Sequence, residues 1–250
     1  MCGRYVSVKA TEDLLDEFDA LDVTEGSATE TDYNVAPTTG VRIVVTRVPH
    51  GQPKTDPAVR QLRVARWGLV PSWAKDPSIG SKMINARAES VADKPAFAKA
   101  FATRRCLLPA DGWYEWQRID GADGKPGKQP FLMRRTDGRS LALAGLYEFW
   151  KPKDDPAADL LLSVTIVTVP SAGELAEIHN RMPLAIAQSD WTRWLDPTAG
   201  GPAELLQPGD EAARELLELR PVSDRVNNVA NNAPDLLDEV RPAIEAQQLF

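Results

Sequence analysis

The chain begins Met1-Cys2-Gly3-Arg4, and Cys2 is the residue with the most distinctive chemistry. A small second residue normally allows the initiator methionine to be removed, which would leave Cys2 with a free α-amine beside its thiol. The unperturbed pKa is about 7.7 to 8.0 for the amine and about 8.5 for the thiol, so both react near neutral pH. With an aldehyde, such a pair condenses to an imine, and the thiol then closes on the imine carbon to give a thiazolidine. We therefore expect Met1 to be removed and Cys2 to act as a nucleophile.

Other groups that could bind a metal are sparse. The chain has two cysteines and two histidines, and none of them stands at the C-x-x-C or H-x-x-x-H spacing of a zinc site. Two cysteines in a chain of this length do not form a disulfide framework. We expect reduced thiols, no metal and no cofactor.

Seven short motifs follow one another along the chain: MCGRY (1–5), YNVAPT (33–38), RWGLVPSW (66–73), INARAES (84–90), ADGWYEW (110–116), IHNRMP (178–183) and PVSDRVNN (221–228). In these motifs and their order the chain resembles the SOS response-associated peptidase (SRAP) family. The peptidase of that name refers to removal of the family's own N-terminal residues. The resemblance implies a groove for single-stranded DNA, in which Cys2 bonds to the ring-opened sugar of an abasic site through a thiazolidine. An associated abasic-site lyase activity and partners at the replication fork are compatible with that function.

The resemblance also assigns catalytic roles to residues. Glu115 in WYEW matches the family's catalytic glutamate, and a carboxyl between Trp113 and Trp116 would be desolvated, which raises its pKa and suits it to proton transfer. His179 in IHNRMP matches the catalytic histidine, whose imidazole could protonate the sugar ring oxygen. Asn85 in INAR matches a position that holds the abasic sugar.

A second set of matched residues is expected to bind DNA. Arg87 lies two residues after Asn85, so on an extended segment both side chains would face one groove. Arg4 and Arg181 are expected to grip phosphates, because a planar guanidinium suits two-point contact with oxygen. Trp73 matches a tryptophan that stacks near the lesion. Asn34 is assigned to the same interface, where it is expected to orient the N-terminus or a loop.

The charge of the chain is unevenly distributed. The net charge is −7, which alone argues against nucleic acid, yet residues 60 to 118 contain eleven Lys or Arg against five Asp or Glu. Residues 11 to 32 contain nine acids and no base, and residues 201 to 250 contain ten acids against four arginines. A basic middle between acidic ends is typical of a protein with one anion-binding face.

The hydrophobic pattern predicts an α+β chain that is rich in strands, a barrel-like mixed sheet with a few peripheral helices. Apolar runs predict strands over 5–8, 41–48, 61–70, 105–117, 129–135, 140–150 and 160–169. Helical patterns cover 11–21 after a threonine cap, 86–102, and 171–179 after a capping serine. The segment GADGKPGK (121–128) resembles a phosphate loop only superficially, because its spacing is wrong, and we interpret it as a hairpin loop.

We expect one domain over residues 1–250, with a core at about 2–230 and an acidic C-terminal segment packed on it. No apolar run approaches the roughly 20 residues of a membrane span, and the N-terminus does not resemble a signal peptide, so we expect a cytoplasmic monomer that associates with the nucleoid when bound to DNA. Two alternatives remain. In an amidohydrolase of the N-terminal-nucleophile type, Cys2 would attack an amide. In a non-covalent single-strand binding module, Cys2 would be inert.

Overall fold

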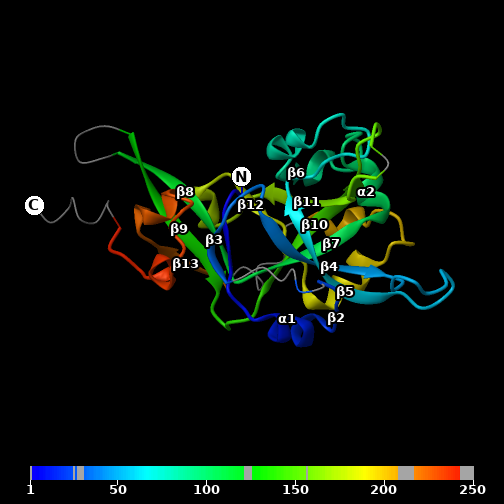
Figure 1. Cartoon of the computed structure of the whole chain (residues 1–250). Helices are drawn as coiled ribbons and strands as arrows, with labels where there is room; N and C mark the ends of the chain where they lie inside the picture. Colours follow the sequence, from blue (N-terminus) through cyan, green and yellow to red (C-terminus); the bar gives the residue numbers. More distant parts are fainter. Residues whose placement is uncertain are drawn as a thin grey trace, which may run out of the picture.

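The centre of the computed structural model is a closed ring of five strands (Figure 1). The structure describes residues 2–24, 26, 31–120, 126–155, 157–207 and 217–242. Four neighbouring pairs in the ring are antiparallel, and a parallel pairing of Val164 with Trp67 closes it. The strands of the ring, in order, are β11 (Leu161–Pro170), β10 (Leu141–Trp150), β7 (Arg105–Ala110), β4 (Gly40–Arg47) and β5 (Val59–Trp67). The predicted barrel-like mixed sheet is therefore confirmed.

Two strands of the barrel, β7 and β10, carry apolar runs that are buried on both faces. Every residue of β7 is buried, as are the first eight residues of β10. Strands that are buried on both faces have continuous rather than alternating hydrophobic sequences, which is the pattern found here. Gly68 ends β5 with a φ of 123°, and a Cβ there would lie 2.5 Å from the carbonyl oxygen of Gly80. This close approach turns the chain into the segment that carries Trp73.

A second, antiparallel sheet lies beside the barrel (Figure 1). Residues 105–120 connect the two sheets, because β7 belongs to the barrel and the chain enters the second sheet after Asp111. The predicted strand over 105–117 is thus divided between two sheets. The turn of the predicted hairpin loop, 121–125, lies outside the described residues. The strands of this sheet, in order, are β13 (Leu217–Pro221), β9 (Pro126–Arg135), β8 (Gly112–Asp120), β1 (Tyr5–Ser7) and β3 (Asp32–Val35).

Three short strands extend the barrel sheet. β2 (Leu21–Asp22) pairs with β5, while β6 (Asn85–Arg87) and β12 (Arg181–Pro183) both pair with the second half of β11. β6 runs parallel to β11 and β12 antiparallel to it, so Thr168 is the register partner of Arg87 in one strand and of Pro183 in the other. Two motifs that are almost 100 residues apart in sequence therefore meet at one end of β11.

The helices are short and peripheral. They are α1 (Thr11–Phe18), α2 (Ala98–Thr103), α3 (Leu175–Ile178) and α4 (Trp191–Leu195), and the 3₁₀ turns are Pro77–Lys82, Ala88–Ser90, Gln188–Asp190, Ala203–Leu205, Asp224–Asn227 and Pro234–Leu237. Phe18 of α1 stacks on Trp191 of α4, with ring centroids 4.4 Å apart. Within the described part of the chain, no helix is long and apolar enough to cross a membrane.

The helix predictions were partly wrong. Thr11 lies inside α1, where Ala10 is the cap residue and provides no side-chain hydrogen bond, and α3 begins after Glu174 rather than at a capping Ser171. The predicted helix over 86–102 is instead the end of β6, a 3₁₀ turn and α2. Pro95 disfavours helical backbone at the residue before it, and pairing with β11 holds residues 85–87 extended.

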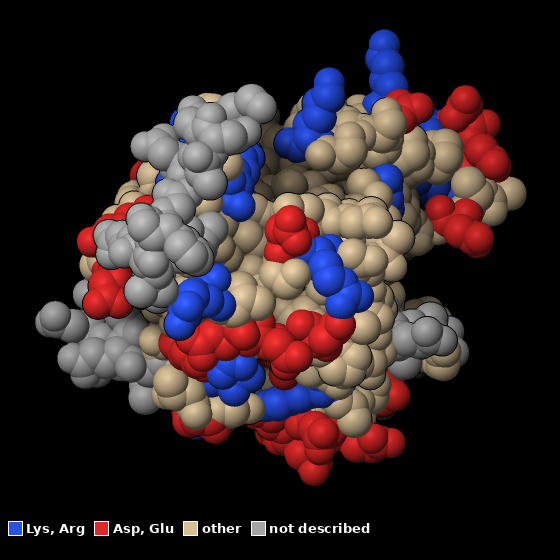
Figure 2. Space-filling view, turned by 90° about the vertical axis from the view of Figure 1, so that its left-hand side faces the viewer, with Lys and Arg blue, Asp and Glu red and all other residues tan. Residues whose placement is uncertain are grey.

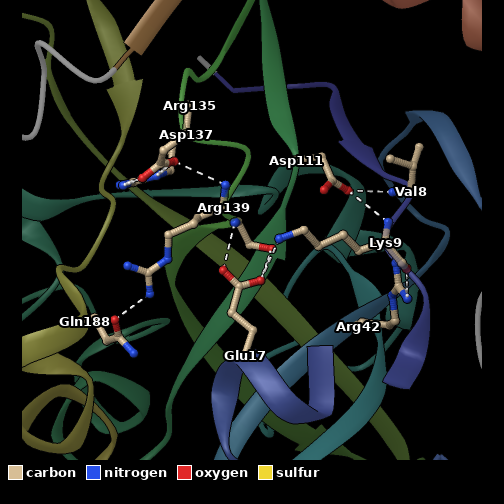
Figure 3. A network of polar contacts seen from close by, with 10 residues as sticks. Val8, Lys9, Glu17, Arg42, Asp111, Arg135, Asp137, Arg139 and Gln188 are labelled. Atoms are coloured by element: carbon tan, nitrogen blue, oxygen red, sulfur yellow. Dashed lines mark hydrogen bonds and ion pairs between the residues drawn. The ribbon is translucent and has the colours of Figure 1, made fainter. Parts of the chain in front are cut away.

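A polar network fixes the start of the chain to the molecule (Figure 3). Glu17 on α1 accepts hydrogen bonds from the Ser140 backbone N–H at 2.9 Å and from Lys9 at 2.8 Å. The buried guanidinium of Arg42 donates to the Lys9 carbonyl oxygen at 2.8 Å, and Asp111 accepts from the Val8 N–H at 2.6 Å. Because these contacts hold residues 8 and 9, they also fix the direction in which β1 leads back to Cys2.

The end of the described chain packs on the second sheet. β13 pairs with β9, and Val222, Val226 and Leu236 are buried against Val6 and Tyr114. The acidic residues within 208–216 and 243–250 lie outside the described residues.

Candidate active site between the two sheets

Cys2 lies just before β1 of the second sheet and contacts β6 of the barrel sheet. Its side chain is 0 % exposed, and Asn85 of β6 donates a hydrogen bond from Nδ2 to the Cys2 carbonyl oxygen at 2.8 Å. Burial raises the pKa of the Cys2 thiol, and the nearby Glu115 carboxylate raises it further. The thiol is therefore protonated at neutral pH, and it must lose its proton to a base before or as it forms a bond. The prediction that Met1 is removed concerns a residue outside the described ones.

Glu115 comes from β8 of the second sheet and is 3 % exposed. It is held by the antiparallel pairing of β8 with β9, in which Phe131 is its register partner. Burial raises the pKa of its carboxyl to about 7. Near neutral pH the carboxyl is therefore protonated about half of the time, which suits a group that must both accept and donate protons.

His179 follows α3 and approaches Glu115 from the barrel side. Its Nδ1 lies 4.0 Å from Oε2 of Glu115, and it lies 3.0 Å from both the backbone N–H and the backbone carbonyl oxygen of Arg181. The ring accepts from the N–H in one neutral tautomer and donates to the carbonyl oxygen in the other. Burial lowers the pKa of His179, so the neutral ring is favoured at pH 7. Of the two groups, Glu115 is thus the better proton donor near neutral pH.

Asn85 completes the group around Cys2. β6 holds it by parallel pairing with Ile166 of β11, so its position depends on the barrel. While Nδ2 donates to Cys2, Oδ1 is buried and accepts no hydrogen bond from any described residue. A buried amide oxygen without a donor is costly, and a hydroxyl or amine of a bound molecule could supply that donor.

Arg4 and Asn34 form a second cluster, in which they bind the chain near 226–231. Arg4 donates from one terminal nitrogen to Oδ1 of Asn34 at 2.7 Å and to the Val226 carbonyl oxygen at 2.9 Å. Asn34 is 2 % exposed, and its Nδ2 lies within 3.0 to 3.2 Å of three backbone carbonyl oxygens, those of Val226, Asn228 and Asn231. Asn34 therefore holds Arg4 and this loop together.

Sequence reasoning overlooked a contact in the same loop. Nε1 of Trp116, the residue after Glu115, donates to Oδ1 of Asn227 at 2.6 Å. The motif PVSDRVNN marked this segment but indicated no contact with the site.

The remaining predicted DNA-binding residues differ in their surroundings. Arg87 is exposed, and within the described part of the chain its side chain makes no ion pair or hydrogen bond, although its backbone pairs with β11. Arg181 is paired with Glu89, a residue to which sequence reasoning gave no role. Trp73 is 50 % exposed, and no hydrogen bond or ring contact among the described residues joins it to Cys2.

Charges of both signs cover the end of the molecule shown in Figure 2. The surface is hollowed near its upper edge, with Lys and Arg side chains on both rims, while acidic side chains gather lower on the same face. Among the residues that the structure describes, no group of three or more His, Cys, Asp or Glu side chains is placed to hold a metal ion.

Fold and site together define a two-sheet β protein with a buried cysteine, a carboxyl and an imidazole where the sheets meet. The chain belongs to the SOS response associated peptidase (SRAP) family, whose model matches residues 1–229. It is 36 % identical over 241 residues to the abasic site processing protein YoaM of Bacillus subtilis, a match that covers 95 % of this chain and 98 % of that protein. It is 32 % identical over 226 residues to the abasic site processing protein HMCES of Xenopus tropicalis, and this match covers 82 % of this chain and 65 % of that protein.

Solved structures share the fold. A protein from Bacteroides thetaiotaomicron superposes with a TM-score of 0.78 over 96 % of this chain and 100 % of its own, at 21 % identity. A phage-related protein from Bordetella bronchiseptica gives a TM-score of 0.63 at 27 % identity, over 88 % of this chain and 94 % of its own.

Proposed function

We propose that this protein captures abasic sites in single-stranded DNA by forming a thiazolidine between the sugar aldehyde and Cys2, once Met1 has been removed. The observation that carries the proposal is the meeting of Cys2 with Asn85, Glu115 and His179 between the two sheets. Relatives at 32 to 36 % identity are named abasic site processing proteins, which supports this class of substrate.

The chemistry assigns each group a step. The α-amine of Cys2 adds to the aldehyde carbon of the ring-opened sugar, and the resulting carbinolamine loses water to give an imine. The sulfur of Cys2 then adds to the imine carbon while the thiol proton is transferred to the imine nitrogen, which closes a five-membered ring. No oxidant or reductant is needed, because every step is an addition or a dehydration.

Proton transfer is the part that the protein must supply. Because burial raises the pKa of the Cys2 thiol, a base has to take its proton, and we assign this task to Glu115, which has a pKa of about 7 and acts electrostatically on the thiol. The same carboxyl can protonate the departing hydroxyl of the carbinolamine. His179, neutral at pH 7, donates from Nε2 to a sugar oxygen, and Asn85 accepts a hydrogen bond from the sugar or the amine at Oδ1.

Denaturing electrophoresis tests the proposal. The protein is incubated with a labelled single strand that contains one abasic site, and a covalent adduct should appear with the wild type and with the matched control Cys106→Ser, but not with Cys2→Ala. Cys106 suits the control because it is the other buried cysteine and lies in β7. Strand cleavage in the same gel would reveal an accompanying lyase activity. Binding without an adduct would favour a non-covalent module, and Cys2-dependent release of ammonia from glutamine would favour an amidohydrolase.

A further inference from the structure

Glu89 forms a two-point ion pair with Arg181. Both terminal nitrogens of the guanidinium donate to the carboxylate, NH1 to Oε1 and NH2 to Oε2, the latter at 3.1 Å. The Arg181 side chain is 14 % exposed, whereas the Glu89 side chain is 50 % exposed. Glu89 therefore covers the outward end of the guanidinium, and it remains accessible to solvent.

The rest of the guanidinium faces the protein. NH2 also donates to the carbonyl oxygen and to Oγ1 of Thr168 on β11, and Nε is buried. The two-point geometry by which an arginine grips a phosphate requires two neighbouring N–H groups that face the ligand. In Arg181 the two terminal nitrogens are both bound to Glu89, and Nε is buried.

Arg87 provides a contrast at the same end of β11. Its register partner is Thr168, the residue whose carbonyl oxygen also accepts from Arg181, so both arginines belong to one small region. Arg87 is exposed and forms no direct ion pair among the described residues. The hydrogen bond from Arg181 lowers the pKa of the Glu89 carboxyl, and the charge of Arg87 helps to lower it. Glu89 lies two residues further along the chain, and its carboxylate would repel a phosphate held near Arg87.

We propose that Glu89 is an intramolecular competitor of the DNA backbone, which occupies the phosphate-binding end of Arg181 in the free protein and is displaced when a strand binds. The inference rests on the proposed function, because it assumes that Arg181 contacts a phosphate. Glu89 is thereby a specificity-determining residue. It lowers the non-covalent affinity for any single strand, so that the protein stays on a strand only when Cys2 forms the covalent bond.

The test measures non-covalent binding of an undamaged labelled single strand by fluorescence anisotropy at low salt. Glu89→Gln and Glu89→Ala should bind on the order of 3- to 10-fold more tightly than the wild type, tenfold being about 1.4 kcal/mol. The matched control is Asp93→Asn, which removes the same charge from an exposed residue four positions along the chain. Because salt screens an exposed charge, this change should alter the affinity by less than about 2-fold. In an Arg181→Ala background, Glu89→Gln should give no gain.

Two outcomes would overturn the inference. If Glu89→Gln and Glu89→Ala, both folded by circular dichroism, bind no more tightly than the wild type, Glu89 instead holds Arg181 in place for DNA. If Glu89→Gln still increases the affinity in the Arg181→Ala background, the effect does not act through Arg181. If Asp93→Asn increases the affinity as much as Glu89→Gln does, the change in net charge explains the effect. Failure of the proposed function would look different, because the wild type would then give no adduct with an abasic strand.

Discussion

Replacing Glu115 by glutamine removes an ionisable group from the site between the sheets while nearly preserving its shape. Burial raises the pKa of the Glu115 carboxyl from 4.5 to about 7. Since one pKa unit corresponds to 1.36 kcal/mol, ionising Glu115 costs the folded state about 3 kcal/mol. The folded state holds the proton more tightly than the unfolded state does. The stabilisation is therefore fully present below about pH 4.5 and is lost as the pH rises through about 7.

Urea unfolding at pH 5 and pH 8 measures this effect. The unfolding free energy of Glu115→Gln minus that of the wild type should increase by roughly 2 to 3 kcal/mol between the two pH values, because only the wild type must bury a charge at pH 8. Other titrating groups act in both proteins and largely cancel in the difference. Glu12→Gln, which removes an exposed carboxylate of α1, is the control and should show no such increase. A difference that stays constant with pH, or that falls, would refute the account of Glu115.

Three further results are expected. Asn34→Ala should lower the unfolding free energy by about 3 kcal/mol in urea unfolding, because Arg4 loses an acceptor and three backbone carbonyl oxygens lose a donor; a loss below about 1 kcal/mol would contradict the role of Asn34. The affinity for an undamaged single strand should fall as the salt concentration rises, and the slope of log affinity against log salt concentration should be roughly −2 if Arg4, Arg87 and Arg181 each neutralise a phosphate. An affinity that does not change with salt would contradict phosphate contacts by these arginines. Capture of an abasic strand should slow by roughly 100-fold or more in Glu115→Gln or His179→Ala, as timed on denaturing gels, and capture at the native rate would exclude a direct role.

The barrel strands could be predicted because they are rich in apolar and β-branched residues, in long runs in β7, β10 and β11 and interrupted by arginines in β5. The short strands were not predicted: β2, β3, β12 and β13 have two to five residues each, and their existence depends on a partner that is distant in sequence. The residues of α2 were predicted to be helical, but the helix was drawn too long, because the alanine-rich pattern before Pro95 gives no sign of the pairing between β6 and β11.

The candidate site was predictable as a set of residues, not as a set of contacts. Cys2, Glu115 and His179 could be selected from their chemistry and from the motifs around them. The contacts of Arg181 with Glu89 and of Asn34 with Val226 span 92 and 192 residues of sequence, and no local pattern encodes them. Only the fold shows that one arginine of the predicted interface is exposed, whereas another is paired with a carboxylate.

The most direct test of the central claim is the intact mass of the protein before and after incubation with an abasic single strand. The free protein should lack the mass of Met1, and the adduct should weigh as much as the free protein plus the DNA minus one water. Fragmentation should show the DNA attached to both the nitrogen and the sulfur of Cys2, and the closed ring should resist reduction by borohydride. An active preparation that retains Met1, or an adduct that maps to any residue other than Cys2, would contradict it.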